Sequence, residues 1–509
     1  MHEPPASILH ALLGWQDRDP QRPCLRFGGR VLSYGQLGDQ VALVAGGLRR
    51  LGFQRGDRLA LFLDNSPRFL CCYLGALLAG AVVVLVNTQY RQVELRHLLS
   101  DSEARLAITD TPRRAELARV QPDLPALERV VLADGPASDG DIAYDALISG
   151  APLDQPELPA ASDLALIAYT SGTTGRSKGA MLSHGNLAAN SAAVTTAWGW
   201  TSADRLLLTL PLFHIHGLGV GIHGTLLAGA QADLRTRFEA AEVFDQLLAA
   251  PPTMFFGVPT MYTRLIGEAR RRGVRPPPIR LYVSGSAPLS PQTFAEFAEL
   301  FGQPILERYG MTETVMNTTN PLEGERRPGT VGRPFPGQEA RVVDVASRTP
   351  LPDGEIGEIQ VRGPHVCLGY WRCPDATAEV FGSDGWFSTG DLGHCSNDGY
   401  YTIVGRAREL IISGGYNVYP REVEDVLVAC PGVAEVAVFG APDPEFGELV
   451  AAAVVRAPGS DLSEEQLVAF CRDQLAAYKK PRRVLFLDAL PRNAMGKVQK
   501  QELRGRLGA

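Results

Sequence analysis

The chain has 509 residues, of which 45% are hydrophobic and 21% are charged, and its formal net charge is −7. This composition excludes a disordered chain, the length indicates more than one domain, and the acidic balance argues against a nucleic-acid-binding protein. None of the eight cysteines forms a CxxC pair, so we expect free thiols in a reducing compartment. The N-terminus lacks a signal-peptide pattern, and the longest apolar stretch, 73–86, is too short to span a bilayer. The expected location is the cytoplasm.

Short β-branched runs alternate with amphipathic stretches through the first 300 residues. We expect strands at 58–63, 81–86, 106–109, 129–132 and 205–210, and helices at 34–51, 73–78 and 92–100. Such alternation predicts an α/β fold of βαβ units, in which helices cover parallel sheets. From 332 to 401, short runs separated by turn signals such as Asn397-Asp-Gly399 predict an antiparallel, barrel-like β unit.

A new compact segment is expected after residue 406. It carries a predicted helix at 420–430, strands at 433–439 and 450–455, and a helix at 463–475. About 100 residues are enough for a small α+β domain. We therefore expect two domains, a large one formed by residues 1–406 and a small one formed by residues 407–509.

The most informative segment is the loop at 169–179, Tyr-Thr-Ser-Gly-Thr-Thr-Gly-Arg-Ser-Lys-Gly. From Thr170 to Gly179 it holds three glycines, five hydroxyl residues and Lys178. Glycines let a backbone approach a ligand closely, and backbone N–H groups, hydroxyls and a lysine together suit a polyphosphate. The loop is not a Walker A motif, because Ser177 precedes Lys178 where that motif requires glycine. On composition alone, a flexible surface loop is the alternative.

Further motifs follow in order. They are Glu-Arg-Tyr-Gly-Met-Thr-Glu-Thr at 307–314, Ser-Thr-Gly-Asp-Leu at 388–392, Gly-Arg at 405–406, Ser-Gly-Gly-Tyr-Asn at 413–417 and Pro-Arg-Asn-Ala-Met-Gly-Lys at 491–497. With the 169–179 loop they resemble the acyl-adenylate-forming superfamily of acyl-CoA synthetases, luciferases and peptide-synthetase adenylation domains, over nearly the whole chain. The resemblance implies a ligase that uses ATP and Mg²⁺ to activate a carboxylic acid and then transfers the acyl group to coenzyme A.

The resemblance also implies a role for each motif. Lys497 is similar to the lysine that the C-terminal domain inserts during adenylation, Lys178 belongs to the loop that grips the β- and γ-phosphates, and Glu313 is the expected Mg²⁺ ligand. Asp391 is expected to bind both ribose hydroxyls, and Tyr309 offers a flat face to adenine. The expected nucleotide-binding set is Thr170, Ser171, Gly172, Thr173, Thr174, Gly175, Lys178, Gly285, Ser286, Ala287, Glu307, Arg308, Tyr309, Thr312, Asp391 and Arg406.

The second half-reaction adds three elements. In this superfamily the C-terminal domain rotates between the two steps, and the resemblance implies Arg408 as the hinge. Gly414, Gly415 and Tyr416 match the loop on the coenzyme A side. His214 matches a wall of the acyl pocket and is a further catalytic candidate, although a lone histidine is more often structural.

The identity of the acid is the sharpest hypothesis. The segments 261–264, 284–286 and 307–317 look like those of malonyl-CoA synthetases, in which an arginine at the position of Arg264, helped by a serine, holds the distal carboxylate. Guanidinium binds a carboxylate through two parallel hydrogen bonds, so Arg264, Ser286 and His214 form the expected carboxylate site. Arg264 exposed on an ordinary helix is the alternative, and the rival anchors are Arg235, Arg237 and Arg280. Methylmalonate differs from malonate by one methyl group, worth only ~1–3 kcal/mol of discrimination.

Other activities stay open at this point. One is a short-chain, medium-chain or aryl acyl-CoA ligase, and another is a free-standing acyl-adenylating enzyme that loads a carrier protein. A non-catalytic nucleotide-binding protein would be expected to lack Lys178, Glu313, Asp391 or Lys497, and all four are present.

Overall fold

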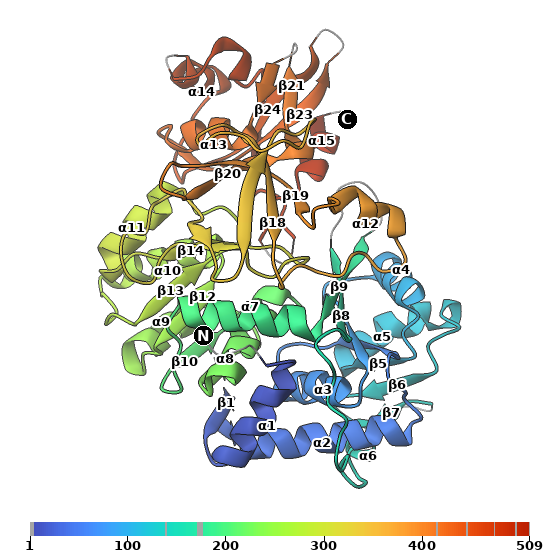
Figure 1. The fold of residues 1–509 in the computed structure, drawn as a ribbon. Helices are drawn as coiled ribbons and strands as arrows, with labels where there is room; N and C mark the ends of the chain where they lie inside the picture. Colours follow the sequence, from blue (N-terminus) through green and yellow to red (C-terminus); the bar gives the residue numbers. More distant parts are fainter. Residues whose placement is uncertain are drawn as a thin grey trace.

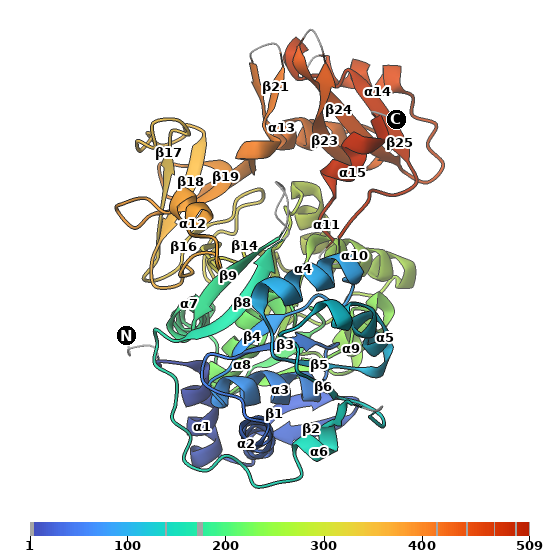
Figure 2. The same ribbon diagram turned by 90° about the vertical axis from the view of Figure 1, so that its right-hand side faces the viewer.

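The computed structural model describes residues 5–137, 140–170, 177–413, 416–443, 446–472, 474–493 and 496–507. Figures 1 and 2 show a large N-terminal part that carries a small C-terminal part at one end. The α/β fold expected from the sequence is confirmed. Helices cover the sheets, which is the layered arrangement that alternating strands and helices favour.

Two large sheets form the core of the N-terminal part. In the described residues, the larger sheet has the order β16-β15-β14-β13-β12-β10-β11-β1-β2, and the other has the order β7-β6-β5-β3-β4-β8-β9. Their central strands pair in parallel, whereas β8 and β9 pair antiparallel. The strands of the first sheet are β1 (Pro23–Phe27), β2 (Arg30–Ser33), β10 (Arg205–Leu208), β11 (Gln231–Leu234), β12 (Met254–Gly257), β13 (Leu281–Ser284), β14 (Leu306–Tyr309), β15 (Thr318–Thr319) and β16 (Arg333–Pro334). Those of the second are β3 (Arg58–Phe62), β4 (Val82–Leu85), β5 (Leu106–Thr109), β6 (Arg129–Leu132), β7 (Ile142–Ala143), β8 (Leu164–Thr170) and β9 (Lys178–Ser183).

The helices begin where capping residues permit. Ser33 and Gln36 form a capping box at the start of α2, which matches the helix expected at 34–51. The helix expected at 73–78 begins six residues earlier, because Ser66 accepts a hydrogen bond from the Phe69 N–H and Pro67 occupies the first turn. The N-terminal helices are α1 (Ile8–Arg18), α2 (Tyr34–Arg50), α3 (Pro67–Leu78), α4 (Gln92–Ser102), α5 (Thr111–Val120), α6 (Tyr144–Leu147), α7 (His184–Ala197), α8 (His223–Ala228), α9 (Ala240–Ala249), α10 (Pro259–Arg272), α11 (Pro291–Phe301) and α12 (Pro374–Val380), with a π-helix, η2 (His216–Ile222), before α8.

The antiparallel, barrel-like unit expected after residue 332 is a four-stranded meander in the described residues. Its strands are β17 (Glu339–Val343), β18 (Gly357–Arg362), β19 (Phe387–Cys395) and β20 (Tyr401–Arg406). Gly354 and Gly399 have φ angles of +85° and +86° in the turns that precede β18 and β20. Glycine adopts this left-handed region without the steric cost that other residues carry, which is why the Asp-Gly signals mark these turns.

The C-terminal part has its own sheet, formed by β21 (Ile411–Ser413), β22 (Tyr416–Val418), β23 (Val433–Asp443), β24 (Gly447–Arg456) and β25 (Arg483–Leu487). Its helices are α13 (Pro420–Val428), α14 (Glu464–Cys471) and α15 (Lys500–Leu507). The helix expected at 463–475 ends at Cys471. The division proposed at residue 406 falls between β20 and β21, and Figure 1 shows the orange and red C-terminal elements grouped together.

All eight cysteines are free thiols, six of them buried and two half-buried. Within the described ranges, no helix is long and apolar enough to cross a membrane.

Candidate active site

A cleft of about 1840 Å³ lies between the two parts of the molecule. Pockets for small molecules usually measure about 300–1,000 Å³, so this one has room for more than one reactant. Its walls come from α4, the β8–β9 hairpin, residues 388–390 of β19, the segment 406–409 and α15. The cleft is therefore a place where residues far apart in the sequence meet.

Lys178 and Thr170 face each other at the root of the predicted phosphate loop. They form a β8–β9 pair, so the loop connects two antiparallel strands. The predicted residues Ser171, Gly172, Thr173, Thr174 and Gly175 lie outside the described residues. The Lys178 ammonium lies 5.4 Å from the centre of the Tyr370 ring, and both Lys178 and Thr170 line the cleft.

Glu313 is a buried carboxyl at the edge of the same cleft, with 6% of its surface exposed. Burial raises its pKa, while the hydrogen bond from the Tyr370 hydroxyl lowers it. The bond from Tyr370 to Oε1 of Glu313 is 2.9 Å long. Such a group favours a nearby cation, because a cation stabilises the charged form that burial disfavours.

Asp391 is held by two protein groups, one on each carboxylate oxygen. The Tyr309 hydroxyl donates to Oδ2 at 2.5 Å, and Arg406 Nε lies 2.8 Å from Oδ1. Asp391 raises the pKa of Arg406 above its usual value, and burial raises that of Tyr309. The preceding Gly390 has a φ of +69° and donates its N–H to Glu358. Because each carboxylate oxygen has two lone pairs, Asp391 keeps the capacity to accept further hydrogen bonds.

Lys497 reaches the cleft from the C-terminal part. The residue is exposed, yet its ammonium lies among protein groups: burial there lowers its pKa, Arg406 lowers it further, and Glu409 and Asp391 raise it. Its backbone N–H donates to the Asn493 side chain at 2.9 Å. The structure thus brings Lys497 close to Asp391, 106 positions earlier in the chain.

The cleft is also lined by His214 and Ser286. The His216 backbone N–H lies 3.3 Å from Nδ1 of His214. Burial, with a contribution from Arg308, lowers the pKa of His214 to about 4, so the ring is neutral near pH 7. Because a backbone N–H can only donate, Nδ1 is the acceptor and the ring proton sits on Nε2.

Arg308 is a buried neighbour of His214 and is not among the residues that line the cleft. It is 2% exposed, and its Nε and Nη2 have no hydrogen-bond partner among the described residues. Its guanidinium packs on Gly285, where an added Cβ would stand 2.4 Å from Cζ of Arg308. Burial lowers the pKa of Arg308 to about 9. The site therefore contains a buried cation whose donors are unused.

The neighbouring ionisable groups do not neutralise Arg308. The groups that act on it are the Tyr262 phenol and the Glu307 carboxyl. Burial raises the pKa of Tyr262 well above 10, and it raises that of Glu307 to about 8. Glu307 accepts a hydrogen bond from the Leu289 N–H at 3.0 Å. Both groups are mostly uncharged at pH 7, so the positive charge of Arg308 has no full counter-charge beside it.

The arginines considered from the sequence have other environments. Arg235 donates to Gln246, Arg237 pairs with Glu239 and Arg280 pairs with Asp204. Arg264 is exposed on α10 and is not among the residues that line the cleft. Its role in binding an acid stays a prediction.

The remaining predicted residues lie at different depths. Thr312, Arg406 and Arg408 line the cleft, and Arg408 is exposed. Gly285, Ala287, Glu307 and Tyr309 stand behind its wall, outside the set of lining residues. Tyr416 is 59% exposed and stacks on Tyr478, with ring centres 4.6 Å apart. Gly414 and Gly415 lie outside the described residues.

Sequence reasoning missed Tyr370 and Glu409, which both line the cleft. Tyr370 bonds to Glu313 and lies beneath Lys178, and its backbone bridges to Ala180 of β9. No motif marks it, because only this long-range pairing brings it to the site. Glu409 lies next to Arg408 and pairs with Lys500 at 3.4 Å.

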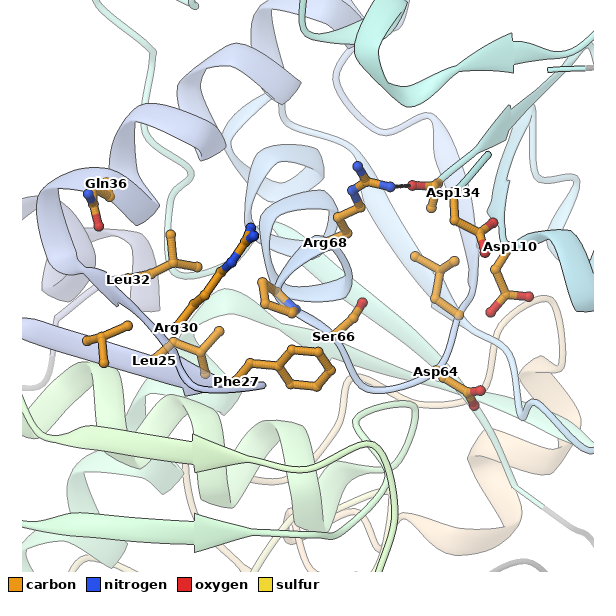
Figure 3. A pocket seen from close by; sticks show the side chains of 14 residues that line it. Leu25, Phe27, Arg30, Leu32, Gln36, Asp64, Ser66, Arg68, Asp110 and Asp134 are labelled. Atoms are coloured by element: carbon orange, nitrogen blue, oxygen red, sulfur yellow. Dashed lines mark hydrogen bonds between the residues drawn. The ribbon is translucent and has the colours of Figure 1, made fainter. Parts of the chain in front are cut away.

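A second cavity of about 570 Å³ lies away from these residues. Figure 3 shows apolar side chains such as Leu25, Phe27 and Leu32 in its lining, together with charged ones such as Arg30, Asp64 and Arg68. None of the predicted site residues lines it.

Comparisons with known proteins agree with this arrangement. Residues 14–371 match the model of the AMP-binding enzyme family, and residues 422–497 match that of the AMP-binding enzyme C-terminal domain. A feruloyl-CoA synthase from Amycolatopsis is 39% identical over 96% of both chains. A sulfoacetate–CoA ligase from Cupriavidus necator is 36% identical over 95% of this chain and 94% of its own. A malonate–CoA ligase from Arabidopsis thaliana is 32% identical over 95% of this chain and 86% of its own.

Solved structures are also similar to this chain. The crystal structure of ATP-bound MatB from Rhodopseudomonas palustris superposes with a TM-score of 0.92, at 41% identity over 98% of both chains. The apo structure of MatB superposes with a lower TM-score of 0.80. Both family models match in order, on either side of a cleft that is lined by Lys178, Glu313 and Lys497, and the chain belongs to the AMP-binding enzyme family as an AMP-forming acid–thiol ligase.

Proposed function

We propose that this ligase is a malonate–CoA ligase, which forms malonyl-CoA, AMP and pyrophosphate through a malonyl-adenylate. The observation that carries the proposal is the buried guanidinium of Arg308, whose Nε and Nη2 have no partner among the described residues. Burying an unpaired charge is costly. A substrate that brings its own negative charge to the wall formed by His214 and Ser286 would offset that cost.

The groups around Arg308 support an anionic acyl end. His214 and Ser286 line the cleft with an Nε2–H and a hydroxyl, and Arg308 is buried behind the lining with unused N–H groups, so donors and positive charge gather there. An alkyl tail would leave these donors unsatisfied, at about 1–3 kcal/mol for each buried group. A distal carboxylate would accept from His214 and Ser286 and would be attracted by the charge of Arg308.

The residues Asp391, Lys178, Lys497 and Glu313 fit the activation step. Asp391 is proposed to hold the ribose, and Lys178 and Lys497 to stabilise the charge that develops on the phosphates. Glu313 fits Mg²⁺, because its carboxyl lines the cleft and is held in place by the hydrogen bond from Tyr370 to Oε1. Mg²⁺ takes few carboxylates and completes its shell with phosphate oxygens and water. When bound, it would neutralise phosphate charge.

The arrangement of the two parts supports the same step. The chain superposes better on ATP-bound MatB, with a TM-score of 0.92, than on apo MatB, with 0.80. We infer that the structure represents the adenylation arrangement, in which Lys497 enters the cleft. Rotation about Arg408 would then bring the loop of Gly414 and Gly415 to the site for coenzyme A.

Sulfoacetate is a second candidate substrate, because its distal sulfonate would also accept hydrogen bonds from a wall of donors. A sulfoacetate–CoA ligase is among the relatives at 36% identity. Feruloyl-CoA synthase, at 39% identity, acts as the counter-example, since identity at this level does not fix the acid. Methylmalonate is proposed as a further substrate if the cleft has room for one methyl group.

Thioester formation with ATP, Mg²⁺ and CoA tests the proposal across malonate, methylmalonate, sulfoacetate, acetate, butyrate, octanoate, benzoate and ferulate. The product is identified by mass, and pyrophosphate release gives the rate. A preference for malonate supports the proposal, and a preference for sulfoacetate keeps the anion site but changes the acid. Preference for ferulate, benzoate or octanoate would refute a distal anion site while leaving the ligase activity intact.

A further inference from the structure

His216 stands directly behind the wall that is proposed to hold the distal acid group. It is the first residue of η2 (His216–Ile222), it is 1% exposed, and it is not among the residues that line the cleft. Its ring lies nearly parallel to that of Phe256, with centres 6.5 Å apart. His216 cannot touch a substrate from this position, so any influence on the substrate passes through a neighbour.

Two contacts connect His216 to the cleft. Its backbone N–H donates to Nδ1 of His214 at 3.3 Å, and its own ring Nδ1 lies 3.1 Å from the hydroxyl oxygen of Ser286. The other ring nitrogen, Nε2, is buried without a partner among the described residues. His216 is thus the group that connects the two polar side chains, His214 and Ser286, of this wall.

The bond to Ser286 can run in either direction, and the direction decides what the serine offers to the cleft. Burial lowers the pKa of His216 well below 6.5, with further lowering by Arg308 and His214, so the ring carries one proton. If that proton is on Nδ1, the ring donates to Ser286 and the hydroxyl proton is free to point into the cleft. If it is on Nε2, the serine donates to the ring and offers only lone pairs, which repel a carboxylate.

We propose that His216 is a positioning residue that donates from Nδ1 to Ser286 and so holds the Ser286 hydroxyl as a hydrogen-bond donor to the distal acid group of the substrate. This inference rests on the proposed function. Two observations support the direction of the bond. Nε2 has no acceptor among the described residues, so a proton there would be buried without a partner. Ser286 is a non-glycine residue held at a φ of +69°, a conformation that persists where the surrounding structure fixes it, often at functional sites.

The test uses two substitutions that differ in one donor. In His216→Asn the side-chain amide can replace Nδ1–H, whereas in His216→Leu no donor remains. For His216→Leu we expect KM for malonate to rise tenfold or more while kcat/KM for propionate, which has a methyl group in place of the distal carboxylate, changes less than threefold. For His216→Asn we expect KM for malonate to return to within about threefold of the wild-type value.

A double-mutant cycle with Ser286→Ala isolates the connection. If His216 acts through Ser286, His216→Leu has little further effect on malonate in the Ser286→Ala background. His223→Leu is the control, because His223 is a buried histidine that bonds to Tyr73 instead. Thermal unfolding of all variants checks the fold, and we expect the His223 variant to lose stability without a change in the ratio of malonate to propionate.

Four outcomes would overturn the proposal. Equal losses for malonate and propionate would make His216 a purely structural part of the wall. Additive effects in the cycle would show that His216 does not act through Ser286. Failure of a folded His216→Asn to restore KM for malonate would show that the Nδ1–H donor does not account for the effect of His216. A wild-type enzyme that does not prefer acids with a distal anion would overturn the proposed function as well, which separates the two failures.

Discussion

Replacing Arg308 by methionine should reduce malonate activation while leaving the fold intact. Nε and Nη2 of Arg308 are buried without partners among the described residues. With the side chains of one wall between them, a carboxylate in the cleft lies about 6–8 Å from this charge, and at an effective dielectric constant of about 20 the attraction is about 2–3 kcal/mol. That corresponds to roughly 30- to 100-fold in kcat/KM for malonate. Propionate lacks the distal carboxylate, and its kcat/KM should stay the same or rise.

The same substitution should not lower thermal stability. Methionine has a similar length and removes an unpaired buried charge, a change that is often neutral or stabilising. Arg280→Met is the matched control, because it would leave the 4% exposed Asp204 side chain without its ion pair, and we expect a clear loss of stability there. Pyrophosphate release and thermal unfolding are measured on both variants. If Arg308→Met unfolds at a lower temperature and activity with both acids falls alike, Arg308 is structural and the reasoning fails. Arg264→Met, measured in parallel, tests whether the exposed arginine is the anchor instead.

Four further predictions concern the residues proposed to bind the nucleotide and its metal. Lys497→Ala should abolish adenylate formation but largely spare thioester formation from supplied malonyl-adenylate, and equal loss of both steps would contradict its role. Because the pKa of Lys497 is lowered, the wild-type adenylation rate should decline with rising pH at a pKa below the usual lysine value of about 10.4, and a decline only above that value would contradict the assignment. Asp391→Ala should weaken ATP binding, measured by titration, since it removes the proposed ribose acceptor and leaves Arg406 without its partner; unchanged affinity would remove the ribose role. Glu313→Gln should raise the Mg²⁺ concentration required for half-maximal activity, and an unchanged Mg²⁺ dependence would show that the carboxylate does not bind the metal.

Local signals made much of the fold predictable. The strands at 106–109 and 129–132 are observed with the expected bounds, because short β-branched runs buried on both faces leave little ambiguity. The predicted start of α3 is too late, because Ser66, which caps the helix, and Pro67 precede the apolar run at 73–78 on which the prediction rests. The order of strands within each sheet is set by long-range pairing, for which the sequence offers no local mark.

Site residues that belong to a sequence motif could be predicted, whereas those whose environment depends on tertiary contacts could not. The structure brings Lys178, Glu313, Arg406 and Lys497 to one cleft, as motifs in fixed order suggested. The environment of Arg308 could not be read from the sequence, because burial and the absence of a described partner are properties of packing. Arg264, the anchor that the resemblance implies, is exposed, and its role stays a prediction.

The most direct test of the central claim is the ratio of wild-type kcat/KM for malonate to that for propionate, measured with saturating ATP, Mg²⁺ and CoA. The two acids differ only in the distal group. A site built to bind a polar group rejects an analogue that lacks it by several powers of ten, so we expect malonate to be preferred at least about a hundredfold. A ratio near one, or a preference for propionate, would contradict the account of this cleft as a site for an acid with a second negative charge.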